Sequence, residues 1–182
     1  MSKIIIINGL PGTGKTTLVE KLADKLEVPY FTKDDFKEIL GDTIGFSNHE
    51  DTKYFGKMSF SALYLIAKRI ISAGEDLIIE GNFTAGEETE EFRNFLLEKG
   101  VEVREIFCIT EPIILKERLL GRSRHPVHNT LSTEEMMNFV LRVTGGEYKC
   151  KKFNVSDVYE LDTTHPEVIN YSKIYDFVQN KF

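Results

Sequence analysis

Short apolar runs alternate along the chain with longer segments in which apolar residues recur every three or four positions. The short runs predict β-strands, and the longer segments predict amphipathic helices that pack against a sheet. Because helical segments lie between the strand-like runs, the pattern predicts a mainly parallel sheet in an α/β fold. The five predicted strands are residues 3–8, 28–32, 76–80, 101–109 and 158–161.

Two of the predicted helices have an apolar face that is visible from the spacing of the residues. The first face consists of Leu18, Val19, Leu22, Ala23 and Leu26. The second face consists of Phe55, Met58, Ala62, Ile66 and Ile70. Both faces are expected to pack on the sheet.

Two helix starts are also predicted from the sequence. The spacing of Ser132 and Glu135 is that of a capping box and predicts a helix start, and Thr164 with Glu167 predicts the start of the last helix.

Two polar stretches without helical spacing are predicted to be loops with a functional part. Residues 41–52 form the first. Residues 121–130 form the second, which is basic, contains Pro126 and separates two helical segments. Residues 113–144, which include this second loop, are therefore predicted to form a helical lid.

Composition limits the class of protein further. The chain has 182 residues, of which 41% are hydrophobic and 29% charged, which favours one domain over residues 1–182. No apolar run approaches the ~20 residues that a membrane span needs. The two cysteines, Cys108 and Cys150, favour a reducing, cytoplasmic location. The net charge of −6 argues against a broad nucleic-acid surface.

A glycine-rich turn follows the first predicted strand and precedes the first predicted helix. Its sequence matches G-x-x-x-x-G-K-[ST], the motif whose backbone amides bind the phosphates of a nucleotide. Lys15 is predicted to reach the β- and γ-phosphates of ATP, and Thr16 is predicted to ligate Mg²⁺. The predicted ATP-binding residues are Gly9, Leu10, Pro11, Gly12, Thr13, Gly14, Lys15, Thr16 and Thr17.

Other classes of nucleotide-binding protein fit the sequence less well. A GTPase would carry the guanine-reading pattern N-K-x-D, but the only Asn-Lys pair is Asn180–Lys181, next to the C-terminus. A mechanical ATPase would normally have a longer chain. A small kinase therefore fits best.

The second predicted strand is followed by two acids, Asp34 and Asp35. Ligands bind at the carboxyl ends of strands in open α/β sheets, and a carboxylate there can orient an acceptor hydroxyl and take its proton. Asp34 is the predicted catalytic base. The alternative for both acids is a favourable position in the first turn of the next helix, and we prefer that interpretation for Asp35.

The stretches "GLPGTGKTTL" and "YFTKDDFKEIL" resemble the P-loop kinases that include polynucleotide 5′-kinases, zeta-toxin-like kinases and chloramphenicol-phosphotransferase-like kinases. The resemblance covers most of the chain. It implies a three-layer P-loop NTPase fold of the nucleotide-kinase kind, with a helical lid and a five-stranded parallel sheet in the order 2-3-1-4-5. It also implies that Asp34 activates the acceptor. The group usually has an arginine three residues later, where this chain has Lys37, a candidate substrate-binding residue.

The third predicted strand ends in Glu80, Gly81 and Asn82. Glu80 is a candidate for holding Mg²⁺ through water or for contacting the acceptor, and Asn82 is a candidate for binding an acceptor or phosphate oxygen. An acid at a strand end followed by a turn-forming Gly-Asn pair is the alternative interpretation.

Three arginines lie in or near the predicted lid. Arg118 and Arg122 are four residues apart on a predicted helix and Arg124 follows, so their guanidinium groups could converge. Arg122 and Arg124 are predicted to stabilise the charge of the transferring phosphoryl group, and Arg118 is a candidate nucleotide-binding residue. A solvated basic face is the alternative. His125 and His128 lie in the same loop, without the further ligands that zinc would need nearby in sequence.

These features predict an Mg-ATP-dependent kinase whose acceptor is a hydroxyl of a small molecule. One alternative is a polynucleotide or nucleoside 5′-hydroxyl kinase, which would need a basic groove for its acceptor. An alternative of another class is a non-catalytic regulator that binds ATP and has no use for Asp34. The sequence does not identify the acceptor or the oligomeric state.

Overall fold

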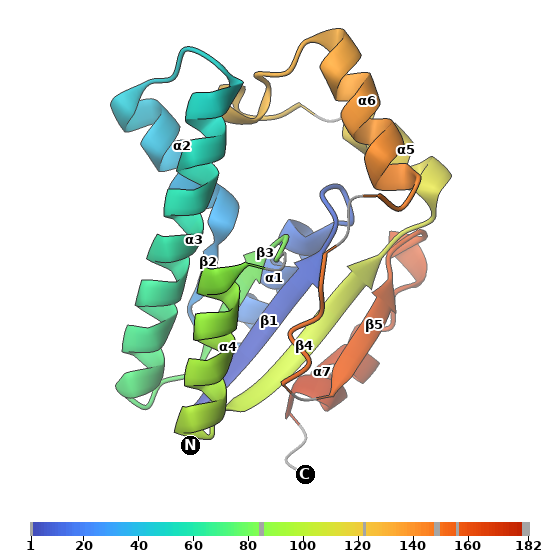
Figure 1. Cartoon of the computed structure of the whole chain (residues 1–182). Coiled ribbons are helices and arrows are strands. Elements are labelled where there is room, and N and C mark those ends of the chain that lie inside the picture. Colours follow the sequence, from blue (N-terminus) through green and yellow to red (C-terminus); the bar gives the residue numbers. More distant parts are fainter. Residues whose placement is uncertain (1, 84–85, 122, 148–149, 156, 180–182) are drawn as a thin grey trace.

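The chain folds around one sheet of five parallel strands, as a computed structural model shows for residues 2–83, 86–121, 123–147, 150–155 and 157–179 (Figure 1). The strands are β1 (Lys3–Gly9), β2 (Tyr30–Thr32), β3 (Leu77–Gly81), β4 (Glu102–Ile109) and β5 (Val158–Asp162). Their order in the sheet is β2-β3-β1-β4-β5, and every neighbouring pair is parallel. The predicted fold class and strand order are therefore confirmed.

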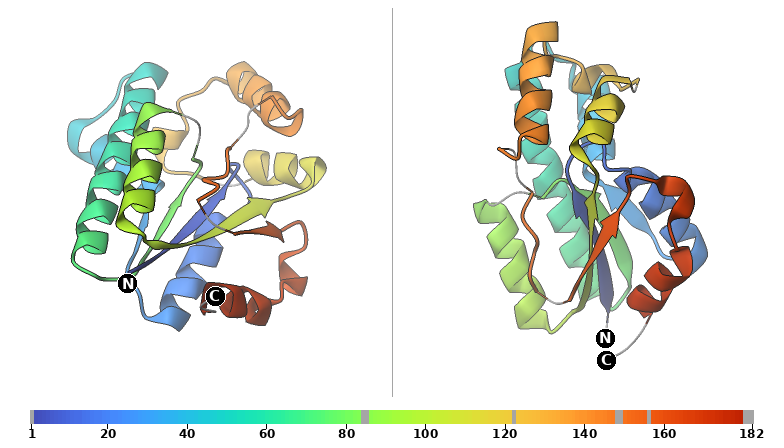
Figure 2. Two further views of the ribbon diagram at one scale, coloured as in Figure 1. Left: turned by 60° about the horizontal axis from the view of Figure 1, so that its bottom comes forward. Right: turned by 90° about the vertical axis from the view of Figure 1, so that its right-hand side faces the viewer.

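Helices cover both faces of the sheet (Figure 2). One face packs against α3 (His49–Ser72) and α4 (Glu87–Lys99), and the other packs against α1 (Lys15–Leu26) and α7 (Tyr171–Gln179). The isoleucines of β1 alternate between the two sides, because Ile4 and Ile6 belong to the first core and Ile5 and Ile7 to the second. A strand buried on both faces explains this uninterrupted apolar run.

The remaining helices lie beyond the carboxyl ends of the strands (Figure 1). Helix α2 (Lys33–Ile44) directly follows β2, and α5 (Pro112–Gly121) and α6 (Thr133–Thr144) pack against each other around a small core of their own. Two short 3₁₀ helices, η1 (Pro126–His128) and η2 (Pro166–Val168), interrupt the connections. Within the residues that the structure describes, no helix is both long and apolar enough to cross a membrane.

Two expectations about local structure were wrong. Residues 41–52 are not one loop, because α2 extends to Ile44 and α3 begins at His49. The last helix does not start in a capping box at Thr164, whose hydroxyl instead accepts a hydrogen bond from the backbone amide of Glu111. Pro166 begins the 3₁₀ helix η2, and α7 starts only at Tyr171. The Ser132–Glu135 capping box at the start of α6 is confirmed.

The predicted apolar face of α3 was also displaced by about one residue. Its buried positions include two polar residues that the apolar pattern excluded, Thr52 and Ser59. Each satisfies its hydroxyl by donating to a backbone carbonyl of its own helix, at 2.9 Å and 2.6 Å. Because the hydroxyls are satisfied locally, these residues can lie in the buried face. The buried face of α3 comprises Thr52, Phe55, Ser59, Leu63, Tyr64, Ala67 and Ile71.

Candidate functional site

A cleft of 490 Å³ opens at the carboxyl ends of the central strands. Its floor is the phosphate turn between β1 and α1, together with the end of β3. One wall comes from α2 and α3, and the opposite side comes from α6 and from the α5–α6 connection, residues 123–132. In Figure 1 this connection runs from α5 toward the upper ends of α2 and α3. The parallel sheet thus brings together segments that are far apart in sequence.

The phosphate turn contains glycines whose backbone conformation disfavours any other residue, and Gly12 and Gly14 are two of them. Gly14, the residue before α1, has φ 77°, and Gly12 has φ 89°. A side chain on Gly12 would also approach Leu115 and Leu119 of α5 to 3.0 Å and 3.2 Å. The turn is further held by Thr13, whose hydroxyl donates to Leu10 O at 2.8 Å. The two glycines and this hydrogen bond therefore fix the shape of the turn.

Lys15, Thr16 and Glu80 form a cluster at the floor of the cleft, in which Lys15 and Glu80 are buried and Thr16 is exposed. The Lys15 ammonium lies 3.6 Å from Glu80 Oε1 and donates to Leu10 O at 3.1 Å. The Thr16 hydroxyl donates to Glu80 Oε2 at 3.3 Å. Burial raises the pKa of Glu80, and the nearby Lys15 ammonium opposes that rise. The register places Glu80 between Ile7 of β1 and Thr32 of β2, so the sheet itself fixes its position.

A second buried polar cluster lies directly behind the phosphate turn, and the sequence did not reveal it. The Asn8 amide nitrogen donates to Glu105 Oε1 at 3.0 Å and to Lys151 O at 2.8 Å. Its oxygen accepts from the backbone amides of Gly9 and Phe83, at 2.7 Å and 3.2 Å. Asn8 and Glu105 are 0% and 1% exposed. Asn8 therefore joins the start of the turn to β4 and to the segment after β3.

Asp34 lines the wall that α2 and α3 contribute, hereafter the α2–α3 wall. Its carboxylate lies 2.8 Å from the ammonium of Lys33, and 48% of its side chain is exposed. Burial acts to raise the pKa of Asp34, but Lys33, His128 and Lys15 outweigh it and hold the pKa well below its usual range. Asp35 instead is exposed and its backbone amide donates to the Thr32 hydroxyl, as expected in a first helical turn.

Lys37 lies one turn after Asp34 and also lines the cleft. Burial, together with the positive charges of Lys33 and Arg124, lowers the pKa of Lys37 to about 8, although the Asp34 carboxylate acts to raise it. Other residues of the α2–α3 wall are Lys33, His49, Thr52 and Lys53. Of the aromatic and histidine side chains near the start of α3, His49 lines the cleft, Phe55 belongs to the buried core and Tyr54 is exposed.

The α5–α6 connection is attached to the α2–α3 wall through side chains. His125 Nε2 lies 3.0 Å from Asp42 Oδ1, and His128 Nε2 lies 3.2 Å from Glu38 Oε1. Thr130 contacts His49 at 3.0 Å and Thr52 at 3.2 Å. The two loop histidines therefore contact carboxylates of α2. Burial, with the cations Lys37, Lys33 and Arg124, lowers the pKa of His128 to about 4 although Asp34 acts to raise it.

The three arginines do not share one position. Arg124 lines the cleft, whereas Arg118 donates to the backbone carbonyls of Thr163 and Thr164, at 2.7 Å and 3.1 Å. Arg118 thus holds the segment after β5 and is not among the residues that line the cleft. Arg122 lies outside the described residues. Asn82 lines the cleft beside Glu80, as its position at the end of β3 suggested.

Several residues of the site had no signal in the sequence. Lys33 has no signal in the sequence, because a lysine at the start of a helix is common and only the structure shows its contact with Asp34. Asn8 and Glu105 are 97 positions apart, so only the pairing of β1 with β4 brings them together. A polar residue inside a strand that is otherwise buried was the one available hint for both.

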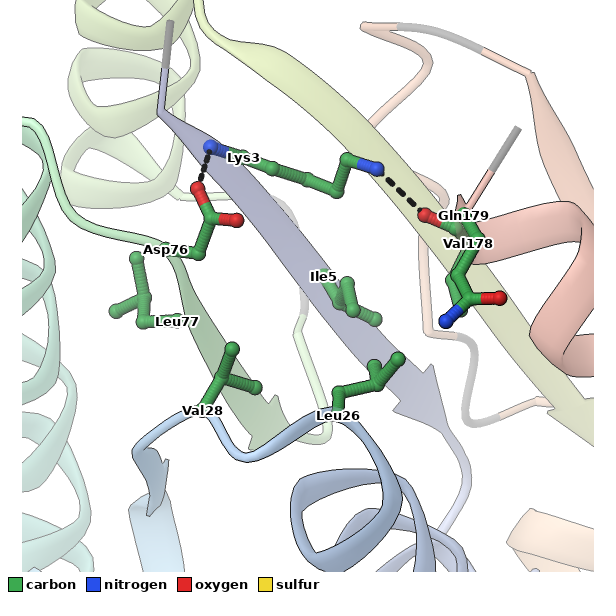
Figure 3. Close-up of a pocket in the computed structure, with 8 residues that line it drawn as sticks. All are labelled: Lys3, Ile5, Leu26, Val28, Asp76, Leu77, Val178 and Gln179. Carbon is green, nitrogen blue, oxygen red and sulfur yellow. Dashed lines mark hydrogen bonds between the residues drawn. The ribbon is translucent and has the colours of Figure 1, made fainter. Parts of the chain in front are cut away.

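A smaller pocket of 160 Å³ lies at the amino ends of β1 and β3, at the other end of the strands from the cleft (Figure 3). The Lys3 ammonium donates there to Val178 O at 2.7 Å, and the Lys3 backbone amide donates to Asp76 at 2.6 Å. The other side chains drawn around it are mainly apolar. This pocket has none of the phosphate-binding features of the cleft. Among the described residues, no group of three or more His, Cys, Asp or Glu side chains is arranged to hold a metal ion.

Comparison with known proteins agrees with this geometry. The family described as the AAA domain matches residues 4–144. A crystal structure of a candidate kinase from Chloroflexus aurantiacus j-10-fl is 31% identical, covers 98% of this chain and 97% of its own, and superposes with a TM-score of 0.87. The family match and this similar structure confirm the expected resemblance to small P-loop kinases of the AAA type. Among curated proteins no significant match was found.

More distant solved structures share the fold. A sugar kinase from Janibacter sp. HTCC2649 is 16% identical, with a TM-score of 0.60 and coverage of 98% of this chain and 96% of its own. Shikimate kinase from Bacteroides thetaiotaomicron is 18% identical, with a TM-score of 0.53 and coverage of 97% and 94%. At these identities the likeness concerns the fold alone.

Proposed function

The chain belongs to the AAA domain family, and on this premise we propose that it is a kinase that transfers the γ-phosphoryl group of Mg-ATP to a hydroxyl of a small molecule. The observation that carries this proposal is the placement of Asp34 across one cleft from Lys15. Lys15 contributes to the low pKa of Asp34, so the two charges lie within electrostatic reach of each other. A regulator that only binds ATP would need Lys15 and would not need Asp34.

The phosphate turn would bind the nucleotide through residues Gly9 to Thr17. Backbone amides and the N-terminus of α1 would bind the phosphate oxygens, and the Lys15 ammonium would neutralise charge on the β- and γ-phosphates. Arg118, which holds the segment of Thr163 and Thr164, would border the nucleotide on the side of β5. The close contact between Thr13 O and the Thr163 hydroxyl, at 2.9 Å, supports a shared nucleotide site for these two segments.

The residues beside Lys15 fit a magnesium ion. Thr16 Oγ1 and Glu80 Oε2 lie 3.3 Å apart, and hydroxyl, carboxylate and phosphate oxygens are the ligands that Mg²⁺ prefers. We propose that Thr16 would ligate the ion and that Glu80 would hold it through water. When bound, the ion would neutralise charge on the phosphates.

Asp34 would orient the acceptor hydroxyl and accept its proton. The low pKa of Asp34 keeps its carboxylate ionised at neutral pH, which makes it an acceptor of a hydrogen bond from the hydroxyl. A carboxylate of low pKa is a weak base early in the reaction. Phosphoryl transfer has a loose transition state, however, in which the proton leaves late and positioning contributes most. Orientation of the hydroxyl is thus the main role proposed for Asp34.

The side of the cleft formed by α6 and the α5–α6 connection would act as the lid predicted over residues 113–144. Arg124, which lines the cleft, would stabilise the charge on the transferring phosphoryl group. We propose the same role for Arg122, as its sequence position indicates. Asn82 and Lys37 would contact the acceptor.

A panel of hydroxyl compounds incubated with labelled ATP and Mg²⁺ tests the proposal. Transfer of label to a small hydroxyl compound, and its loss in Asp34→Asn, is the expected result. ATP binding without transfer to any compound, unchanged by Asp34→Asn, would favour the regulator instead. Strongly salt-dependent labelling of 5′-hydroxyl oligonucleotides alone would favour the polynucleotide kinase.

A further inference from the structure

The cleft has a charge that is opposite to that of the whole protein. The chain carries a net charge of −6. Within the described part of the chain, however, six lysines and arginines line the cleft against two carboxylates, Asp34 and Glu80. The anionic phosphates of ATP would account for Lys15 at the phosphate turn. The cations of the α2–α3 wall lie on the acceptor side and need a separate explanation.

Most of the cations in the cleft already have an acidic partner. Lys15 pairs with Glu80 and Lys33 pairs with Asp34. Lys53 and Arg142 pair with Glu50 and Glu147, and their side chains are 57% and 64% exposed, so solvent screens these charges.

Lys37 differs from the other cations of the cleft. Its side chain is half-buried, and it forms no ion pair with any residue that the structure describes. Its charged neighbours are the cations Lys33 and Arg124 and the carboxylate of Asp34, which already pairs with Lys33, so the positive charges around the ammonium are only partly neutralised. A half-buried ammonium in such surroundings is costly in the free protein and becomes favourable when an anion binds.

The position of Lys37 relative to Asp34 limits how far the two groups of an acceptor that contact them can lie from each other. Residues three apart on a helix lie on the same side, with Cβ atoms about 5–6 Å apart. A molecule whose hydroxyl contacts Asp34 can therefore present a second group to Lys37 only if that group is a few bonds away.

The cleft is also bounded on this side. His125 and His128 contact Asp42 and Glu38 of α2, and Thr130 contacts His49 and Thr52 of α3. The α5–α6 connection therefore lies across the upper end of the α2–α3 wall (Figure 1). A compact acceptor fits this arrangement better than a polymer, which would have to continue past the connection.

We propose that the acceptor is a small hydroxyl compound with a carboxylate or phosphate group a few bonds from the reacting hydroxyl, and that Lys37 binds this anionic group. The inference rests on the proposed kinase function and specifies its substrate class. Asp34 orients the hydroxyl while Lys37, one helical turn away, binds the anion. Lys37 is thus the residue that selects charged acceptors over neutral ones.

Matched pairs of acceptors test the substrate class. The wild-type protein is offered hydroxycarboxylates against their primary amides, sugar monophosphates against the free sugars, and a 5′-hydroxyl oligonucleotide, all with labelled ATP. We expect kcat/KM to be about 10- to 100-fold higher for the anionic member of a pair, as one charge-assisted contact provides. The carboxylate and phosphate arms identify which anion is preferred. Equal or better use of neutral members, or transfer to the oligonucleotide alone, would overturn the inference.

Lys37→Met tests the assigned residue, and Lys99→Met on the exposed end of α4 is the matched control for loss of one charge. Lys37→Met should raise KM for the anionic acceptor by about 10-fold or more and abolish the preference within a pair. Its KM for ATP and its far-UV circular dichroism should not change. Lys99→Met should behave as wild type. A changed KM for ATP with an unchanged acceptor preference would contradict the assignment, because Lys37 would then serve the nucleotide.

Failure of the kinase function and failure of the anion site at Lys37 give different experimental results. If no compound of either charge is phosphorylated, the kinase function fails. Calorimetric titration with the same hydroxycarboxylates and sugar monophosphates, in the presence of a non-hydrolysable ATP analogue, then still examines the anion site. Anion binding that Lys37→Met abolishes supports the site, and binding that is absent or insensitive to Lys37→Met overturns it.

Discussion

The two sides of the cleft are constructed differently. On the phosphate side four polar residues are buried, since Asn8, Thr13, Lys15 and Glu80 are 0%, 1%, 8% and 5% exposed, and each has a hydrogen-bond partner within the protein. On the acceptor side the side chain of Asp34 is 48% exposed. The contacts of the α2–α3 wall with the α5–α6 connection are made by side chains and not by a sheet.

This difference corresponds to two kinds of function. A triphosphate always presents the same oxygens, so a preorganised and buried set of donors suits it. Acceptors differ between kinases of one fold, and function on a shared fold is set by the residues added to it. Under the proposed function, the phosphate side would carry out the general chemistry and the acceptor side would set the specificity. The predictions below separate the two sides.

The largest effect on the catalytic rate is expected from substitution of Asp34. Asp34→Asn removes the charge that orients the acceptor hydroxyl and should lower kcat by about 10²–10⁴-fold, the usual contribution of positioned acid–base catalysis. Affinity for ATP, measured by calorimetry, should change little. Asp35→Asn is the matched control, because Asp35 is exposed and next in sequence. A dead Asp35→Asn beside an active Asp34→Asn would reverse the assignment.

Loss of Lys15 should affect catalysis and stability together. Lys15→Ala removes a donor to the transferring phosphates and should lower kcat by about 10²–10³-fold. It also leaves Glu80 buried without its cation, so the protein should unfold at lower urea concentration than wild type. Lys15→Ala with Glu80→Gln should recover part of the stability and none of the activity. Full activity in folded Lys15→Ala would contradict the phosphate role.

The pH dependence of the acceptor side should follow Lys37. With a pKa of about 8, Lys37 is charged below that pH and loses its charge as the pH rises through it. For an anionic acceptor, kcat/KM should therefore fall above pH 8, approaching 10-fold per pH unit. The charged or titratable groups around Lys37 are Lys33, Asp34, Arg124, His49 and His128.

The variant Lys37→Arg distinguishes the titration of Lys37 from the titration of other groups in the protein. Arginine stays protonated at all accessible pH values, so the alkaline fall should disappear in this variant. His128, with its pKa of about 4, is neutral across the measured range from pH 6.5 to pH 9.5 and cannot cause the fall. An unchanged alkaline limb in Lys37→Arg would assign the titration to another group.

The smallest effect on activity is expected behind the phosphate turn. Asn8→Ala leaves the amides of Gly9 and Phe83 and a carboxylate oxygen of Glu105 without their partner. The free energy of unfolding in urea should fall by about 1–3 kcal/mol, as for a buried group left unsatisfied. Asn94→Ala on the exposed side of α4 is the control and should not change it. Equal stability of the two variants would show that the cluster is dispensable.

The failed local predictions have a common cause. The capping-box spacing at Thr164 was correct as a pattern, but the Thr164 hydroxyl accepts from Glu111, 53 residues away. The apolar face of α3 was displaced because Thr52 and Ser59 are buried with their hydroxyls satisfied inside the helix. In both cases a hydroxyl formed a hydrogen bond that the pattern did not predict, with a distant segment at Thr164 and within α3 at Thr52 and Ser59.

The sequence by itself determined the features that depend on neighbouring residues. Strand periodicity gives the parallel sheet, and the motif from Gly9 to Thr16 gives the phosphate turn, because a strand, a glycine turn and a helix start lie in one continuous stretch. Only the tertiary structure decided which distant residues meet. Thr16 reaches Glu80 across 64 positions, and His128 reaches Glu38 across 90. Such contacts leave no local pattern, because the order of strands in the sheet brings the first pair together and the packing of the α5–α6 connection against α2 brings the second pair together.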